Sequence, residues 1–363
     1  MNTGELSSCP PCSIGQLRQD NDIPQIKRTS ASSRSRAALL SSVGGILCLC
    51  LFTLLASAGV MISGENHSDE PISPIPLEVP LDQAKVKLGR SLFADSRLSA
   101  GNGVSCASCH LFERGLTDGL PISRGLPGSP GGTNTLTLFN VGLNAKLGWD
   151  GHFLSLQDQA KAVVQDKHRM GAKWDDVVPL LRNDIALTAT FNQIYKDGIQ
   201  RDNVIDALAE FEKSLDTPNA PFDRYLRGDD NAISEEAKSG YQLFKNYGCV
   251  SCHQGVNVGG NMLQVFGIFG TPDAASQGLK TPGAAQGSGI DDDRPVFRVP
   301  SLRNVAQTAP YFHDGSVATL SEAIGVMAKY QLGRSISDED VAKIEAFLKS
   351  LSGEYQGVPV GNL

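Results

Sequence analysis

The chain lacks an excess of positive charge, has few aromatic side chains and contains no long runs of alternating polar and apolar residues. Its formal net charge of −7 does not indicate a basic face for nucleic acid. Aromatic residues make up only 6%, but 40% hydrophobic and 20% charged residues are typical of a globular chain. Because alternating runs are absent, we predict an all-α fold. The 363 residues are enough for two or three domains.

The first 80 residues are predicted to lie outside the folded part. Residues 1–36 are polar and indicate a disordered cytoplasmic tail, whereas 37–62 form an uncharged apolar run long enough to span a bilayer. Basic residues in the tail should stay in the cytoplasm, which places the rest of the chain in the periplasm. The run is either an uncleaved inner-membrane anchor, which we favour, or a signal peptide cleaved near Ala56–Ala58. The proline-rich stretch 63–80 is predicted to be a linker.

Four of the eight cysteines fall in two Cys-x-x-Cys-His motifs. This motif is the attachment signature of c-type haem, in which the two thiols bond to the haem vinyl groups and the histidine becomes the proximal iron ligand. Zinc binding, a disulfide and a thioredoxin-type redox pair are the alternatives. Far fewer than one such motif is expected by chance from the composition, so we predict two covalently bound haems c. The residues are Cys106, Cys109 and His110, and Cys249, Cys252 and His253.

Helix signals lie close to the motifs. Ser234 suits an N-cap, and Gly248 suits the end of the same helix, directly before the second motif. Apolar residues at helical spacing predict a helix over 204–215. A last helix is predicted to start after Ser337 and to stop at Gly353.

A weak internal repeat accompanies the two motifs. Residues 88–93 (LGRSLF) resemble residues 239–244 (SGYQLF), each a short distance before a haem motif. We therefore predict two cytochrome c-like helical haem domains in tandem, 81–230 and 231–363, with haem supplying much of each core.

Further phrases extend this pattern over most of the chain. In order they are Leu88–Phe93, Asp95–Ser99, Trp149–Gly151, Phe222–Leu226, Val299–Val305 and Thr308–Gly315. With these phrases in this order, the chain resembles the bacterial di-haem cytochrome c peroxidases and their relatives, which include the maturation enzyme of methylamine dehydrogenase. The resemblance implies a peroxidatic N-terminal haem domain, an electron-transfer C-terminal haem domain and a homodimer.

The resemblance implies that the haem at His253 receives electrons from a small donor protein, a cytochrome c or a cupredoxin. Its distal ligand would be Met327, and thioether ligation raises a haem's reduction potential. Without the resemblance, Met327 would be read as a residue that fills a gap in the core. The maturation enzyme has Tyr at this position, so Met327 favours the peroxidases.

The haem at His110 would be where H2O2 binds, which requires an open sixth position on the iron. Many di-haem peroxidases close that position with a His in the oxidised state. Leu126 occupies the corresponding place here, and no nearby His replaces it. We therefore expect a haem that is five-coordinate or water-bound without prior reductive activation.

The family's distal acid–base is a Glu beside a Met, but Arg169 precedes Met170 in this chain. Cleaving the O–O bond needs a group that moves a proton between the peroxide oxygens. Imidazole is the side chain most often used for such proton transfer, so His168 is a candidate for that role, with a solvated surface His as the alternative. Arg169 is a candidate to stabilise charge on the leaving oxygen, and Gln159 is a further candidate nearby.

Other residues match the family more closely. Trp149 occupies the place of a Trp that bridges the two haems, as an electron relay, a packing residue or both. Asn134 and the backbone carbonyls of Thr308 and Pro310 match a calcium site between the domains. His313 matches a His near the haem interface, with a structural or electronic role.

The predicted function is a di-haem c-type peroxidase that reduces H2O2 to water with electrons from the donor protein. A first alternative is a high-valent di-haem enzyme that oxidises Trp or Tyr of a partner protein; Leu126 favours it and Met327 does not. A second alternative is a non-catalytic di-haem electron carrier. A carrier needs a second ligand at both irons, and the sequence offers one only at the second haem.

Overall fold

The computed structural model describes residues 69–129, 132–270 and 295–363. The predicted cytoplasmic tail and the apolar run at 37–62 lie outside these residues. Within the described ranges, none of the helices has the length and apolar character that a bilayer span requires. The described residues all belong to a single compact unit.

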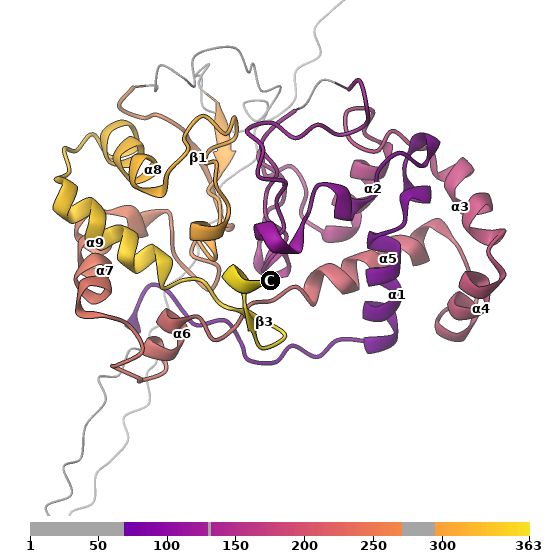
Figure 1. Cartoon of the computed structure of the whole chain (residues 1–363), viewed down its shortest axis with the longest axis horizontal. Coiled ribbons are helices and arrows are strands. Elements are labelled where there is room, and N and C mark those ends of the chain that lie inside the picture. Colours follow the sequence, from indigo (N-terminus) through magenta and orange to yellow (C-terminus); the bar gives the residue numbers. More distant parts are fainter. Residues whose placement is uncertain (1–68, 130–131, 271–294) are drawn as a thin grey trace, which may run out of the picture. The chain divides into compact units, whose positions relative to one another are not determined.

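Short helices account for most of the regular structure (Figure 1). They are α1 (Gln83–Phe93), α2 (Leu156–Gln165), α3 (Trp174–Arg182), α4 (Ile185–Ile194), α5 (Arg201–Lys213), α6 (Pro221–Leu226), α7 (Glu235–Tyr247), α8 (Leu320–Val326) and α9 (Asp338–Lys349). The predicted helical fold is confirmed as helix-rich, and two small antiparallel sheets accompany the helices. The sheets pair β1 (Leu263–Val265) with β2 (Val296–Arg298), and β3 (Glu354–Tyr355) with β4 (Val358–Pro359). Strands of two or three residues are too short to show an alternating pattern in the sequence.

The two halves use the same helix packing around one close-approach glycine each. Figure 1 shows α1 beside α5 and, in the other half, α7 beside α9. A Cβ on Gly89 would lie 2.0 Å from the carbonyl oxygen of Ala207, and one on Gly240 would lie 1.8 Å from that of Lys343. The repeated sequence phrase therefore marks two equivalent helix crossings, at which only glycine lets the backbones meet.

Replacing Gly240 with alanine is expected to destabilise the C-terminal half by about 1–3 kcal/mol, because α7 and α9 must separate to fit the methyl group. Gly325 in α8 is the matched control, since a Cβ there meets nothing within 4 Å. Gly325→Ala should be neutral or stabilising by up to about 1 kcal/mol. Urea unfolding of the haem-loaded protein measures both, and equal midpoints for the two variants would contradict the packing role of Gly240.

The predicted helix starts are confirmed, and one predicted end is wrong. The side chain of Ser234 accepts a hydrogen bond from the Ala237 N–H at the start of α7, and Gly248 ends that helix with φ +95°. Ser337 caps α9 in the same way, but α9 ends at Lys349 and not at Gly353. A Cβ on Gly353 would lie 2.0 Å from the carbonyl oxygen of Thr217, so this glycine serves a close contact between segments and not a helix stop.

Two hydrophobic cores lie in the described residues, and the chain passes between them three times, because Ile72 belongs to the second core before α1 joins the first. The first core is built mainly from α1 to α5, and the second from α6, α7 and α9. Helix α6 precedes residue 231 yet packs in the second core, and Tyr355 near the C-terminus packs in the first. The predicted boundary at 230/231 therefore does not coincide with the division between the cores.

Part of the predicted linker is anchored on the C-terminal half. Ile72 and Ile75 are fully buried, and Ile72 packs in the second core, whereas residues 76–80 are exposed. A buried ion pair between Arg303 and Asp223, with a 2.6 Å contact, holds this segment, because Arg303 also donates to the carbonyl oxygen of Ser73 at 3.0 Å. This ion pair and these two isoleucines fix the chain to the C-terminal half before α1 begins in the other half.

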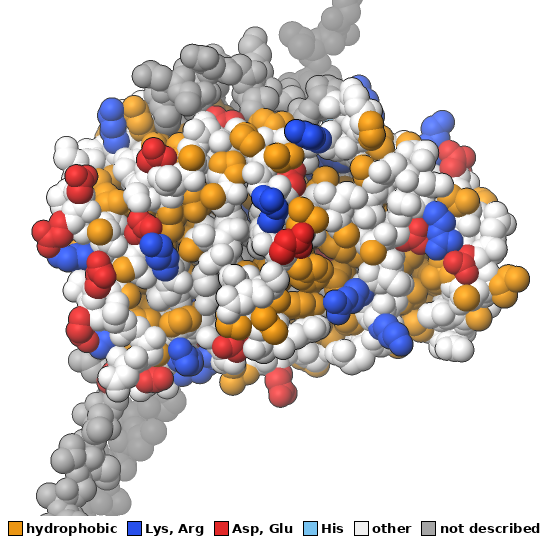
Figure 2. All heavy atoms as spheres, viewed as in Figure 1, with side chains coloured by type: hydrophobic (Ala, Val, Ile, Leu, Met, Phe, Trp, Pro, Cys, Tyr) orange, Lys and Arg blue, Asp and Glu red, His pale blue; other side chains and the backbone are white. Residues whose placement is uncertain are grey.

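Charged side chains of both signs are interspersed over the face seen in Figure 2. Neighbouring charges of opposite sign largely cancel at distances beyond a Debye length of about 8–10 Å. The face in view therefore presents no single-sign patch to a charged partner.

Candidate haem sites

Both Cys-x-x-Cys-His motifs adopt the same local structure. Each begins with a single 3₁₀ turn, over Cys106–Ser108 and Cys249–Ser251. In each, the histidine N–H donates to the carbonyl oxygen of the first cysteine at 3.0 Å. All four cysteines are free thiols. This turn brings two thiols and one imidazole together at each site, which is the donor set that haem c requires.

The two proximal imidazoles are oriented by backbone carbonyls. His110 Nδ1 lies 2.9 Å from the Leu116 oxygen, and His253 Nδ1 lies 3.3 Å from the Val258 oxygen. With Nδ1–H donating to a carbonyl, Nε2 is left to bind iron, which is the usual arrangement of a metal-bound histidine. Burial lowers the pKa of both rings, that of His253 to about 4, so each imidazole is held in its neutral, ligating form.

The two residues whose carbonyls accept from the proximal histidines both have a left-handed backbone conformation. Leu116 has φ +57° and Val258 has φ +48°, a left-handed conformation that costs free energy for a side chain with a Cβ, most of all a β-branched one. Both residues are fully buried, so the surrounding core keeps them in place. The loops that carry Leu116 and Val258 therefore hold each proximal histidine rigidly. The Cys-x-x-Cys-His motif does not predict these loops.

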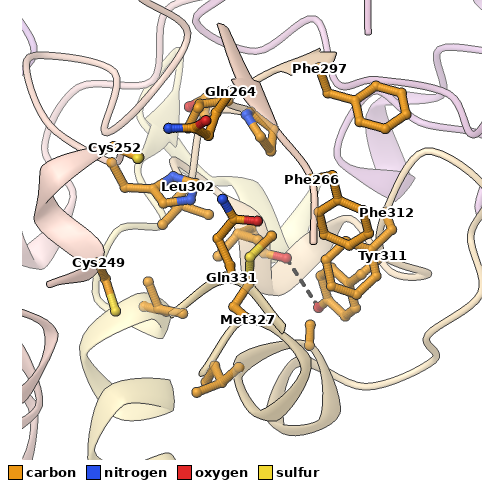
Figure 3. Close-up of a pocket in the computed structure, with 18 of the residues that line it drawn as sticks. Cys249, Cys252, Gln264, Phe266, Phe297, Leu302, Tyr311, Phe312, Met327 and Gln331 are labelled. Carbon is orange, nitrogen blue, oxygen red and sulfur yellow. Dashed lines mark hydrogen bonds between the residues drawn. The ribbon is translucent and has the colours of Figure 1, made fainter. Parts of the chain in front are cut away.

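A large cavity lies in front of His253, and its walls are mostly apolar (Figure 3). Cys249 and Cys252 lie on one side of it, and Phe266, Tyr311 and Phe312 lie on the other. Met327 projects into the same cavity from the start of a π-helical turn, Met327–Gln331, that follows α8. Thiols, imidazole and thioether thus share one apolar cavity, and these residues fit a six-coordinate haem c.

Leu126, at the position where many di-haem peroxidases have the closing His, packs against Gly171. A Cβ on Gly171 would lie 2.7 Å from Leu126 Cδ1, so the leucine side chain covers that glycine. The same loop approaches His168, because Ser129 Oγ donates to the His168 carbonyl oxygen at 3.2 Å. Leu126 offers no atom that could ligate iron.

The residues predicted on the distal side of the first haem differ in how deeply they are buried. Met170 is buried, whereas His168 and Arg169 are exposed, and Arg169 Nε lies 3.5 Å from Asp166. The pKa of His110 is lowered chiefly by burial and also by the positive charge of Arg169, which therefore acts on the His110 site. Gln159 on α2 has a buried Oε1 without a hydrogen-bond partner among the described residues.

Trp149 and His313 form a ring pair, with centroids 6.3 Å apart and planes at 74°. Trp149 donates from Nε1 to the Asn134 carbonyl oxygen at 2.8 Å, and His313 packs against Phe297 at 4.4 Å. All four residues line the cavity of the second haem. The predicted bridging Trp therefore belongs to a buried aromatic cluster beside that cavity.

This ring pair is a second internal repeat, which the sequence reading missed. Trp149-Asp150-Gly151 and His313-Asp314-Gly315 each follow an asparagine by the same nine-residue step. Those asparagines, Asn140 and Asn304, both have φ +59°. Both donate from Nδ2 to the same Thr217 hydroxyl, at 2.8 and 2.9 Å. The sequence signal that could have revealed this repeat is the shared nine-residue spacing from an Asn to an aromatic-Asp-Gly triplet.

The predicted calcium ligands belong to residues that line one cavity. Asn134, Thr308 and Pro310 all line the cavity of His253. The Asn134 side chain donates to the Leu120 oxygen at 2.9 Å, and its backbone N–H donates to the His313 oxygen at 2.8 Å. Across the three described ranges, no cluster of three or more His, Cys, Asp or Glu side chains suits a metal ion. A cation at Asn134 would therefore rely on amide and carbonyl oxygens, which Ca²⁺ accepts.

Comparison with known proteins gives matches along most of the chain. A family model described as di-haem cytochrome c peroxidase matches residues 83–231, and one described as cytochrome c matches residues 237–352. The cytochrome c peroxidase Ccp of Escherichia coli (strain K12) is 43% identical over 80% of this chain, which spans only 63% of that relative. The cytochrome c551 peroxidase of Nitrosomonas europaea is 37% identical, over 85% of this chain and 90% of the relative.

A solved structure agrees with these matches. The crystal structure of a MauG-like protein associated with microbial copper homeostasis superposes with a TM-score of 0.66. It is 28% identical in sequence and covers 78% of this chain and 93% of its own. The likeness therefore extends over both haem motifs and the segment between them.

Proposed function

This chain belongs to the di-haem cytochrome c peroxidase family, and from that premise we propose that it reduces H2O2 to water with electrons from a small donor protein. It is an oxidoreductase of the peroxidase type that carries two haems c. The observation that supports the proposal most is an asymmetry between two otherwise equivalent sites. Met327 and His253 line the same cavity, whereas Leu126, which the resemblance puts at the closing position of the His110 haem, has no ligating atom.

Haem c, when bound, supplies an iron that binds peroxide at the first site and an iron that stores one electron at the second. The chain's residues set this division. His253 and Met327 favour a reduction potential high enough to accept an electron from a cytochrome c or a cupredoxin. His110, held neutral by burial and oriented by Leu116, would be the protein ligand of the haem that supplies peroxide binding.

Proton movement at the peroxide falls to three residues. Gln159 presents a buried, unpartnered amide oxygen that can accept a hydrogen bond from the peroxide. Arg169 supplies a cation that stabilises negative charge on the leaving oxygen. His168, at the same turn, passes the proton from one oxygen to the other.

Trp149 is proposed to relay charge between the two haems. Its indole lies in the buried cluster with Phe297 and His313, and its N–H is fixed by Asn134. Calcium bound by Asn134, Thr308 and Pro310 would keep the Trp149 acceptor in place. We further propose that the protein acts in the periplasm as a homodimer, tethered to the inner membrane by residues 37–62.

Stoichiometry tests this function directly. Under anaerobic conditions, the protein should oxidise two molecules of a one-electron donor, such as reduced cytochrome c or a reduced cupredoxin, for each H2O2 consumed, with saturation in both substrates. Peroxide loss with no donor oxidation would overturn the proposal.

A second candidate function is the oxidation of Trp or Tyr in a partner protein, which Leu126 favours. A His at that place would tie reactivity to prior reduction, and its absence removes this control. This function predicts that peroxide is consumed with one partner protein without oxidising the donor, and that mass spectrometry finds the oxidised aromatic residue.

A further inference from the structure

Two buried polar atoms without partners line the cavity in front of His253. They are Nη1 of Arg298 and Oγ1 of Thr135, and neither has a hydrogen-bond partner among the described residues. The side chains belong to well-buried residues, with Arg298 4% and Thr135 8% exposed. Buried polar groups in native proteins are nearly always hydrogen-bonded, so this pair indicates a ligand that completes them.

Among the residues that the structure describes, the positive charge of Arg298 also has no counter-charge. Arg303, equally buried, has the Asp223 carboxylate at 2.6 Å, whereas no carboxylate of the described residues pairs with Arg298. Burial alone lowers the pKa of Arg298 to about 10, so the guanidinium stays charged near neutral pH. A buried, unpaired cation is costly, which makes an anion the expected occupant of this place.

The remaining bonds of Arg298 lead to the bridging tryptophan. Arg298 Nε donates to the Gly148 carbonyl oxygen at 2.9 Å, and its backbone N–H donates to the Trp149 carbonyl oxygen at 2.7 Å. On the other side, Thr135 directly follows Asn134, whose carbonyl oxygen accepts the Trp149 indole N–H at 2.8 Å. Both unpartnered atoms therefore belong to segments that fix Trp149.

We propose that Arg298 and Thr135 bind one propionate of the haem attached at Cys249 and Cys252, and that Arg298 thereby positions Trp149 relative to that haem. A propionate is the anion that a haem in this cavity brings with it, and guanidinium and hydroxyl groups are suitable donors to a carboxylate. Arg298 is a positioning residue, because it acts on electron transfer through the propionate and through Trp149. The inference rests on haem attachment at His253 and holds whether or not the protein reduces peroxide.

Redox titration of the holoprotein tests the inference without an activity assay. Arg298→Met removes the charge, leaves the propionate uncompensated and stabilises the ferric haem. The equilibrium constant for reducing the Met327-ligated haem should fall about tenfold, equivalent to about 59 mV for one electron. Arg298→Lys should fall between the wild type and Arg298→Met. Thr135→Val, which removes only the hydroxyl, should shift the potential less and in the same direction.

Two controls separate this effect from general damage. Arg224 on α6 is exposed, and Arg224→Gln removes one positive charge from the same half of the chain without changing the proposed site. In Arg224→Gln, the reduction potential of the His253 haem should match that of the wild type. The propionate bending mode in resonance Raman spectra should shift in Arg298→Met and Thr135→Val, and stay in Arg224→Gln.

Wild-type potentials and propionate modes in both Arg298→Met and Thr135→Val would overturn the proposal. If Arg298→Met does not retain both haems, Arg298→Lys and Thr135→Val decide the question by the same two readouts. Peroxide turnover does not enter this comparison, so a failure of the proposed function would leave its outcome unchanged.

Discussion

Replacing Met327 with histidine is expected to lower the reduction potential of the His253 haem by roughly 0.2–0.3 V, within the about 0.8 V that axial ligands span. Imidazole stabilises ferric iron more than a thioether does, so the substitution stabilises the oxidised haem relative to the reduced haem. A shift of this size lowers the reduction equilibrium constant by more than about a thousandfold at 59 mV per factor of ten. The donor could then no longer load the electron-entry haem, and donor-dependent peroxide turnover should collapse, while both haems stay attached.

Met262→Leu is the control for this experiment. Met262 is half-buried in the same half of the chain and does not line the cavity of His253. Spectroelectrochemical titration of both variants should show a shifted potential only for Met327→His. An unchanged potential in Met327→His would mean that Met327 fills space in the cavity and does not ligate iron.

Replacing Arg169 with alanine is expected to lower kcat/KM for H2O2 by about 100–1000-fold, the usual effect of removing one group that stabilises developing negative charge. The charge of Arg169 already acts on the His110 site, where it lowers the pKa of the proximal histidine. Its side chain is half exposed, and its 3.5 Å contact with Asp166 is a surface ion pair worth about 0–1 kcal/mol. The variant should therefore lose activity with little loss of stability.

Lys167→Ala tests whether position matters and not only charge, since Lys167 is exposed on the same turn. Steady-state kinetics should show near wild-type kcat/KM for it. His168→Gln then separates the two proposed roles, because only loss of an acid–base group removes a titration from the pH–rate profile. Equal activity in Arg169→Ala and Lys167→Ala would contradict the role of Arg169.

The parts of the fold that could be predicted from sequence depend on local chemistry. Ser234 and Ser337 cap helices because a hydroxyl satisfies free N–H groups within its own turn. Gly89 and Gly240 could be found because the same phrase surrounds both. Composition did not reveal that Ile72 and Ile75, within the proline-rich stretch predicted to be a linker, are buried.

Long-range contacts account for what the sequence did not reveal in the fold. Ile72 and Ile75 are buried because a distant pair, Arg303 and Asp223, organises the segment around them. Gly353 looked like a helix stop but approaches Thr217, about a third of the chain away. No local pattern reports such contacts.

At the candidate site, the covalent chemistry was visible in sequence and its surroundings were not. The two Cys-x-x-Cys-His motifs can be recognised from the sequence alone. Arg298 cannot be distinguished from the other arginines until the structure shows its burial and its unpartnered Nη1. The carbonyls of Leu116 and Val258 have no sequence signature, because any residue carries a carbonyl. Leu126 was informative only through the family resemblance.

An electron paramagnetic resonance spectrum of the fully oxidised protein, taken before and after one equivalent of H2O2, tests most directly whether the His110 haem is open while Met327 closes the His253 haem. We predict one high-spin and one low-spin ferric signal, both lost when peroxide is added. Two low-spin signals that do not respond to peroxide would contradict this division, and would mean either that a ligand closes the His110 haem until reduction or that the protein only carries electrons.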